Sequence, residues 1–126
     1  MIIGIGVDST EIARMTARLA EKILTLEEYQ LYQQKQGIHQ QQFLAGRFAV
    51  KEAYAKARGT GIGVVKFRDI SVLSTRTGAP YIRLVSPIPG ETYHVSITHD
   101  TVHATAFVII EKRSERGDRD EISNPS

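Results

Sequence analysis

A glutamate and a lysine within one predicted helix are the first residues of this chain that suggest chemistry. Glu52 and Lys56 are four residues apart in an alanine-rich segment, so in a helix their side chains lie on one side. Leu44 and Phe48 precede them at the same spacing, so the two charges continue a stripe that begins apolar and is expected to be buried. Because an uncompensated buried charge is expensive, we interpret Glu52 and Lys56 as functional residues.

Asp8 supplies a second carboxylate at the end of a predicted strand. Residues 2–7 alternate apolar side chains with Gly4 and Gly6, a pattern typical of a buried strand with one nearly bare face. The other face carries Ile3, Ile5 and Val7. Asp8 lies on the bare face, which another group could approach closely.

Asp8 and Glu52 together could hold one hard cation. Mg²⁺ is the ion favoured by a site with few protein ligands, since it keeps several waters and binds substrate phosphate oxygens. Lys56, one turn from Glu52, would then bind the same phosphate. The alternative is that Asp8 caps a helix, with Glu11 completing a capping box, and that Glu52 and Lys56 form an intrahelical pair worth about 0.3–0.5 kcal/mol.

Three helices are predicted to position these residues. One follows residues 8–11 and ends near Ile23, the second covers residues 25–32, and the third covers residues 43–58, with residues 33–42 as a glutamine-rich turn. Gly59 is expected to cap the third helix, and the backbone amides of residues 59–63 could reach an anion. The residues assigned to the outer side of that helix are Arg47, Lys51 and Arg58.

The second half of the chain predicts antiparallel strands. They are expected at residues 70–74, 81–85, 93–98 and 104–110, with a turn at residues 77–80. His99 follows the third of these strands at the end of a hairpin, where a lone histidine is more often structural than catalytic. The predicted fold class is therefore α+β, in which an N-terminal strand and helices precede an antiparallel β-sheet.

The composition is that of one globular domain. The chain has 126 residues, enough for one core and too few for two. We expect a domain at residues 1–112 and a charged, disordered tail at residues 113–126. The absence of cysteine excludes disulfides and thiolate sites. A net charge of +2 without a basic cluster argues against nucleic-acid binding, and no apolar run is long enough for a membrane span, so a cytoplasmic location is predicted.

A basic row is predicted on the first helix. Arg14, Arg18 and Lys22 are four residues apart and would share one face. Such a row is usually solvated, but it could also dock an acidic helix.

Four short motifs resemble the holo-[acyl-carrier-protein] synthases, the small single-domain group of the 4′-phosphopantetheinyl transferase superfamily. The motifs are residues 4–8, residues 47–53 with Lys56, residues 59–63 and residues 96–99. They occur in the family's order, and the resemblance covers about residues 2–111. One departure is Ala79, where the family commonly has lysine, which weakens the expectation of a coenzyme A contact at that turn.

The resemblance implies transfer of the 4′-phosphopantetheine group of coenzyme A to a serine of apo-acyl carrier protein, with adenosine 3′,5′-bisphosphate as the other product. It implies that Asp8 and Glu52 bind Mg²⁺ and that both act in catalysis with Lys56. A carboxylate or a metal-bound water would remove the serine proton, and the sequence leaves this choice open. The resemblance also implies a homotrimer with active sites between subunits, so that His99 serves a neighbour's site.

Further residue roles follow from the same resemblance. The residues implied to bind coenzyme A are Arg47, Lys56, Gly59, Gly61, Pro80 and His99. Arg14 matches a residue that meets the acidic carrier protein, and Arg18 and Lys22 extend that docking surface.

Two other functions are compatible with the residues alone. One is another coenzyme A or nucleotide enzyme that uses the same Mg²⁺–phosphate chemistry. The other is a non-catalytic module that binds an acidic helical partner through the basic row. The module explains the basic row but not the charges of Glu52 and Lys56 on an inner stripe.

Overall fold

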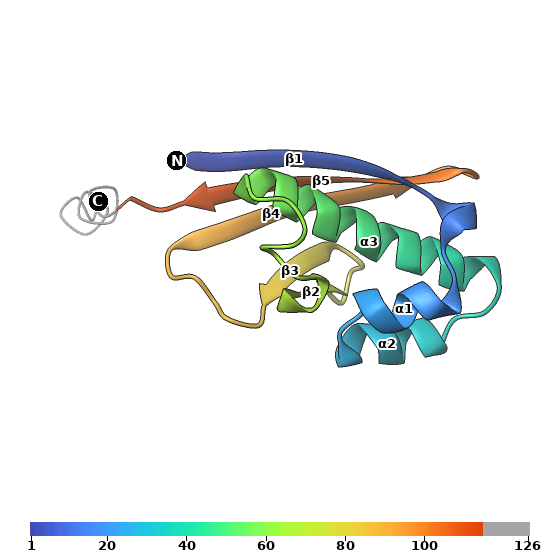
Figure 1. The fold of residues 1–126 in the computed structure, drawn as a ribbon. Coiled ribbons are helices and arrows are strands. Elements are labelled where there is room, and N and C mark those ends of the chain that lie inside the picture. The colour runs from blue at the N-terminus through green and yellow to red at the C-terminus, as the bar shows by residue number, and fades with distance from the viewer. Residues whose placement is uncertain (115–126) are drawn as a thin grey trace.

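The computed structural model describes residues 1–114 as a layer of strands packed on one long helix (Figure 1). The helices are α1 (Ala17–Ile23), α2 (Leu26–Gln33) and α3 (Ile38–Arg58). The strands are β1 (Ile2–Glu11), β2 (Ile70–Ser74), β3 (Pro80–Leu84), β4 (Glu91–His99) and β5 (His103–Lys112). Apart from Arg113 and Ser114, the predicted tail at residues 113–126 lies outside the described residues.

The strands form two antiparallel sheets. The larger has the order β1-β5-β4, and the smaller is the pair β2-β3. Figure 1 shows α3 running along the larger sheet, with β2, β3 and the short helices α1 and α2 on its other side. The predicted α+β class is confirmed, and the four strands predicted in the second half are present with small shifts of their ends. Within residues 1–114, no helix is long and apolar enough to cross a bilayer.

Alternation along the strands decides which side chains enter the core. On β5, Ala106, Val108 and Ile110 point to α3 and are fully buried or nearly so. Small residues of α3, among them Ala49 and Ala53, are buried against them. Small side chains on the helix let the sheet approach closely, and β5 fills the remaining space with branched side chains.

The nearly bare face of β1 is covered by α3. A Cβ atom at Gly4 would overlap the carbonyl oxygen of Ala57, and one at Gly6 would overlap that of Ala53. The strand therefore lies directly on the helix backbone, an approach that only glycine permits.

The opposite face of β1 is exposed in the chain, so the prediction of a buried strand is wrong for that face. Ile3, Ile5 and Val7 are exposed in the chain, as is Phe107 opposite Val7 on β5. The alternation was predicted correctly, but the apolar side faces outward and the glycine side faces the core. Sequence periodicity separates two faces without saying which one meets the helix.

Two element boundaries also differ from prediction. β1 continues through Asp8 to Glu11, and a 3₁₀ turn (Ile12–Arg14) precedes α1, so Asp8 does not cap a helix and that alternative is wrong. Thr16 caps α1 instead, accepting a hydrogen bond from the backbone N–H of Leu19 at 3.2 Å. α3 begins at Ile38, within the segment predicted as a turn.

The assignment of Lys51 to the outer side of α3 is wrong as well. Its side chain is fully buried, and its ammonium lies 2.6 Å from the buried carboxylate of Glu28 on α2. The α3 surface that carries Lys51 is covered by α2 and β2, so it is not a solvent face.

We expect Gly6→Ala to lower the free energy of unfolding by about 3 kcal/mol, the upper part of the range for overpacked cores. The added Cβ would meet the helix backbone, which cannot rotate away as a side chain could. Urea denaturation of the wild type and the variant measures the difference.

Gly46→Ala is the matched control, because a Cβ there would lie 3.5 Å from Ile97 Cγ2, an ordinary van der Waals contact. Removing a glycine from a helix interior favours the helix by up to about 1 kcal/mol. Equal losses for the two variants would contradict the close approach of β1 to α3.

Candidate active site

A hollow of about 370 Å³ opens where β1, the 3₁₀ turn and α3 meet. We call it the acidic hollow, because three carboxylates line it with one arginine: Asp8, Glu11, Arg14 and Glu52. Met15, Leu19 and Phe48 form its apolar wall. The structure thus brings Asp8 and Glu52 together from positions 44 residues apart, as the sequence predicts.

Asp8 is held in a defined orientation. Its Oδ2 accepts a hydrogen bond from Thr10 Oγ1 at 2.9 Å, and its Oδ1 accepts one from Lys56 Nζ at 3.1 Å. Lys56 Nζ also donates to the carbonyl oxygen of Val7 at 3.0 Å. The Asp8 side chain is only 16% exposed, so this carboxylate is both partly desolvated and fixed by two donors.

Glu52 is only half-buried, but its carboxylate receives no hydrogen bond from any residue in the described part of the chain. Burial, and next the neighbouring Asp8 carboxylate, raise the pKa of Glu52 above its ordinary value, while Lys56 opposes this shift. An acidic group with a raised pKa and no donor is the local condition that a bound cation would relieve.

The hollow fits a hard cation that takes few protein ligands. Residues 1–114 contain no group of three or more histidine, aspartate or glutamate side chains that could hold a metal. Asp8 and Glu52, whose charges act on each other in this hollow, are the candidate ligands, a small set that suits Mg²⁺ better than ions that require a full protein cage.

The burial argument that singled out Glu52 and Lys56 holds only in part. Lys56 is 53% exposed and is paired with Asp8, so it is not a buried charge. The stripe runs along the edge where α3 meets β1, and there a long side chain reaches solvent. The fully buried charge of the helix is Lys51.

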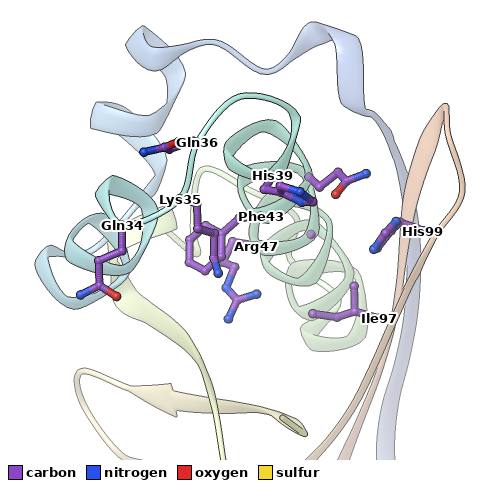
Figure 2. Close-up of a pocket in the computed structure, with 10 residues that line it drawn as sticks. Gln34, Lys35, Gln36, His39, Phe43, Arg47, Ile97 and His99 are labelled. Carbon is purple, nitrogen blue, oxygen red and sulfur yellow. The ribbon is translucent and has the colours of Figure 1, made fainter.

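A second hollow of about 550 Å³ lies beside the N-terminal half of α3 (Figure 2). We call it the basic hollow, because its charged and titratable lining is Lys35, His39, Arg47 and His99, without a carboxylate. Figure 2 shows Phe43 and Arg47 side by side on α3 and His99 apart from them, at the end of β4.

Arg47 is held in the basic hollow by three contacts. Its guanidinium lies 4.0 Å from the centre of the Phe43 ring, a cation–π contact. Its Nε donates to the carbonyl oxygen of Val72 at 3.2 Å, and its terminal nitrogen donates to Ser74 Oγ at 3.3 Å. The outward N–H groups of such a fixed guanidinium suit an anionic oxygen.

The residues predicted to bind coenzyme A do not form one site within the chain. Arg47 and His99 line the basic hollow, while Lys56 is hydrogen-bonded to Asp8, which lines the acidic hollow. The other three lie elsewhere. Gly59 and Gly61 follow the end of α3, and Pro80 begins β3.

The predicted basic row is divided between two elements. Arg14 belongs to the 3₁₀ turn and lines the acidic hollow, whereas Arg18 and Lys22 lie on α1, so the prediction of a single helix face is wrong. All three side chains are exposed.

The residues that orient the predicted site residues, or line the hollows beside them, were not predicted from the sequence. Thr10 orients Asp8, and the available signal was its position two residues further along the same strand face. Lys35 and His39 line the basic hollow, and the glutamine-rich composition around them concealed that role.

The chain is similar to proteins of one family throughout its described domain. The family model of the 4′-phosphopantetheinyl transferase superfamily matches residues 4–109. The holo-[acyl-carrier-protein] synthase of Anoxybacillus flavithermus is 46% identical over 121 residues, covering 90% of this chain and 99% of that protein. The Bacillus subtilis protein of the same name is 44% identical over 121 residues, with the same coverage.

Solved structures show the same fold. A holo-(acyl-carrier-protein) synthase from Bacillus anthracis in complex with CoA (3′,5′-ADP) has a TM-score of 0.83 at 40% identity, covering 90% of this chain and 99% of that one. The Helicobacter pylori enzyme in complex with coenzyme A has a TM-score of 0.72 at 30% identity, covering 85% and 99%.

We expect Glu52→Gln to raise the Tm of the ligand-free protein at pH 8. The folded-state pKa of Glu52 is raised, so ionising it costs stability as the pH rises through its unfolded value. The gain should shrink as the pH falls through the unfolded-state pKa of about 4.3 and vanish near pH 3, where the carboxyl is protonated in both states. Thermal unfolding between about pH 3 and pH 8 measures this dependence.

Glu11→Gln removes another carboxylate of the same hollow, but an exposed one, and should leave the Tm unchanged. Added Mg²⁺ should raise the Tm of the wild type more than that of Glu52→Gln. A pH-independent difference between the wild type and Glu52→Gln would contradict the environment assigned to this carboxylate.

Proposed function

The chain belongs to the 4′-phosphopantetheinyl transferase superfamily, and on this basis we propose that it is a holo-[acyl-carrier-protein] synthase. It transfers the 4′-phosphopantetheine group of coenzyme A to a serine of apo-acyl carrier protein and releases adenosine 3′,5′-bisphosphate. The observation that carries the proposal is that Asp8 and Glu52 line one hollow, with Lys56 hydrogen-bonded to Asp8, in a chain nearly half identical to enzymes of that name. A cytoplasmic location remains a prediction from the sequence.

Asp8 and Glu52 would hold Mg²⁺ beside the pyrophosphate of coenzyme A. When bound, the ion supplies positive charge that offsets the charge developing on the transferred phosphoryl group. Asp8 is already fixed for this task by Thr10, and Glu52 has free lone pairs.

Lys56 provides the mobile positive charge of the site. Its ammonium is half exposed and bound to Asp8 and to a backbone carbonyl, so it can exchange these contacts for phosphate oxygens. The carrier serine loses its hydroxyl proton to a carboxylate or a water at the site, its oxygen bonds to the phosphorus that bears the pantetheine arm, and the bond from this phosphorus to the bridging oxygen breaks. Lys56 then stabilises the charge on the leaving bisphosphate.

The two hollows support an active site shared between subunits of a homotrimer. A single chain places its acidic residues and its Arg47–His99 pair in separate hollows. The outer face of the larger sheet exposes Ile3, Ile5, Val7 and Phe107, an apolar patch that association would bury. The basic hollow of one subunit would then bind a phosphate of the coenzyme A held at a neighbour's acidic hollow.

The carrier protein would dock beside the acidic hollow. Arg14 lines that hollow, and Arg18 and Lys22 continue the positive surface along α1. Positive charge at this edge would steer an acidic carrier so that its serine reaches Asp8 and Glu52.

Incubation with coenzyme A, Mg²⁺ and apo-acyl carrier protein should increase the carrier's mass by one phosphopantetheine. EDTA should stop the reaction, and Glu52→Ala should slow it by about 10²–10³-fold, the loss typical when one electrostatic contact to the transition state is removed. Mass spectrometry of the carrier follows the reaction.

Glu11→Ala, at the rim of the same hollow, is the control and should retain activity. No mass gain under any condition would favour the non-catalytic module that binds an acidic partner. Full activity of Glu52→Ala would remove the metal role of that residue.

Subunit mixing tests the shared site. Asp8→Ala and His99→Ala chains are each expected to be inactive alone. When they reassemble randomly at equal amounts, they should recover about a quarter of wild-type activity, because a shared site needs intact Asp8 from one subunit and intact His99 from its neighbour, each with a probability of about one half. Activity is measured after co-expression or after unfolding and joint refolding.

Recovery that stays at zero would place His99 in the same subunit's site.

Phe107→Asp introduces a charge into the exposed apolar patch and should lower the mass found by sedimentation velocity. A trimer that tolerates this substitution would exclude the patch as the interface.

A further inference from the structure

The ion pair between Glu28 and Lys51 is the most deeply buried charge in the described residues, and the proposed chemistry does not use it. Both side chains are fully buried, and Lys51 Nζ lies 2.6 Å from Glu28 Oε1. Burying two charges costs several kcal/mol even when they are paired, and apolar residues often serve stability as well or better. The pair therefore calls for an explanation beyond stability.

Every polar group of the pair is satisfied, so the network is rigid. The three N–H groups of Lys51 donate to Glu28, to the carbonyl oxygen of Ile23 at 2.7 Å and to that of Phe67 at 3.0 Å. Glu28 also accepts the backbone N–H groups of Thr25 at 2.8 Å and Val72 at 2.7 Å. One ammonium thus ties α3 to α2, to the end of α1 and to the segment before β2.

Val72 links this network to the basic hollow. Its N–H donates to Glu28, and its carbonyl oxygen accepts from Arg47. Arg47 lies one turn before Lys51 on the same side of α3. Both side chains are therefore connected to Val72 of β2, Arg47 directly and Lys51 through Glu28. A shift of β2 would remove the Arg47 contact that fixes its guanidinium in the basic hollow.

Glu52 is the residue after Lys51, and this adjacency links the network to the acidic hollow. Successive helical side chains differ by about 100° in direction. With Lys51 locked towards α2, Glu52 must point to the neighbouring face, where Asp8 lies. A rotation or slide of α3 would move the Glu52 carboxylate away from Asp8.

We propose that the buried Glu28–Lys51 ion pair is a positioning unit, which fixes α3 so that the helix presents one side chain to each hollow. Those side chains are Glu52 for the acidic hollow and Arg47 for the basic hollow. The inference rests on the proposed function, because the two hollows gain their roles from it. In the trimer, one pair would align two different active sites at once.

The deciding variant is Glu28→Met/Lys51→Met, which replaces both charges by apolar side chains of similar length and leaves no unpaired buried charge. We expect its Tm to fall, because the backbone N–H groups of Thr25 and Val72 and the carbonyl oxygens of Ile23 and Phe67 lose their partners, so activity and binding are measured below that Tm. We expect kcat/KM to fall about 10–100-fold, and the Kd for coenzyme A, measured calorimetrically with Mg²⁺, to rise about tenfold. If added Mg²⁺ no longer raised the Tm of the double variant, this result would show separately that the Glu52 carboxylate has moved away from Asp8.

Ile110→Ala is the control for a purely structural effect. Ile110 is fully buried on β5 and lines neither hollow, so its truncation should lower the Tm while the Kd and the kcat measured below that Tm stay unchanged. Wild-type Kd and kcat in the double variant would overturn the inference. If the wild type binds coenzyme A but transfers nothing, the proposed function fails, and the calorimetric comparison still decides the role of the pair.

Discussion

The contact of β1 with α3 through Gly4 and Gly6 is the constraint on which the rest of the molecule depends. Two residues of strand advance roughly 6.6 Å and four residues of helix advance roughly 6.0 Å, so the two elements remain in step over several repeats. Gly4 therefore lies over Ala57 and Gly6 over Ala53. Continued by one step, this register brings Asp8 level with Ala49, and there the longer side chains of Lys56 and Glu52 reach it from the neighbouring stripe of the helix. The absence of side chains at the glycines is thus what places a carboxylate of the strand beside the charges of the helix.

Three charged residues of α3, Lys51, Lys56 and Glu52, lie in environments that differ in burial and in hydrogen-bond partners. Lys51 is buried and fully satisfied by an oppositely charged partner and backbone carbonyls. Lys56 reaches solvent and is paired through Asp8. Glu52 is half-buried beside Asp8 and accepts no hydrogen bond from residues 1–114, and its burial and the Asp8 charge disfavour its ionised form. A bound cation would relieve this unfavourable ionisation, which is why Glu52 stays a predicted metal ligand, whereas the paired charges stabilise the position of the helix.

The arrangement of the two hollows explains why a small domain can act on a large substrate. The acidic hollow offers charges suited to a metal and a pyrophosphate, and the basic hollow offers an arginine and a histidine suited to another phosphate. Both are organised by α3, which runs between the larger sheet and the smaller elements (Figure 1). In the proposed trimer, the exposed apolar face of the sheet would bring hollows of different subunits together. Shared sites of this kind would make activity depend on assembly.

The sequence by itself determined the strand pattern, the long helix and the family, because these follow from local periodicity and from short motifs. It also predicted that Asp8, Glu52 and Lys56 lie together, which the structure shows, while their roles stay a prediction. It did not determine which face of β1 is buried, since alternation with a period of two separates faces without naming the partner. It also assigned Lys51 to the solvent, because a lysine beside other charges on a helix is usually exposed. Only the tertiary structure supplied Glu28, 23 residues earlier in the chain, as the buried partner. The same limit applies to Arg47 and His99, whose distance from Asp8 was decided by packing rather than by any local signal.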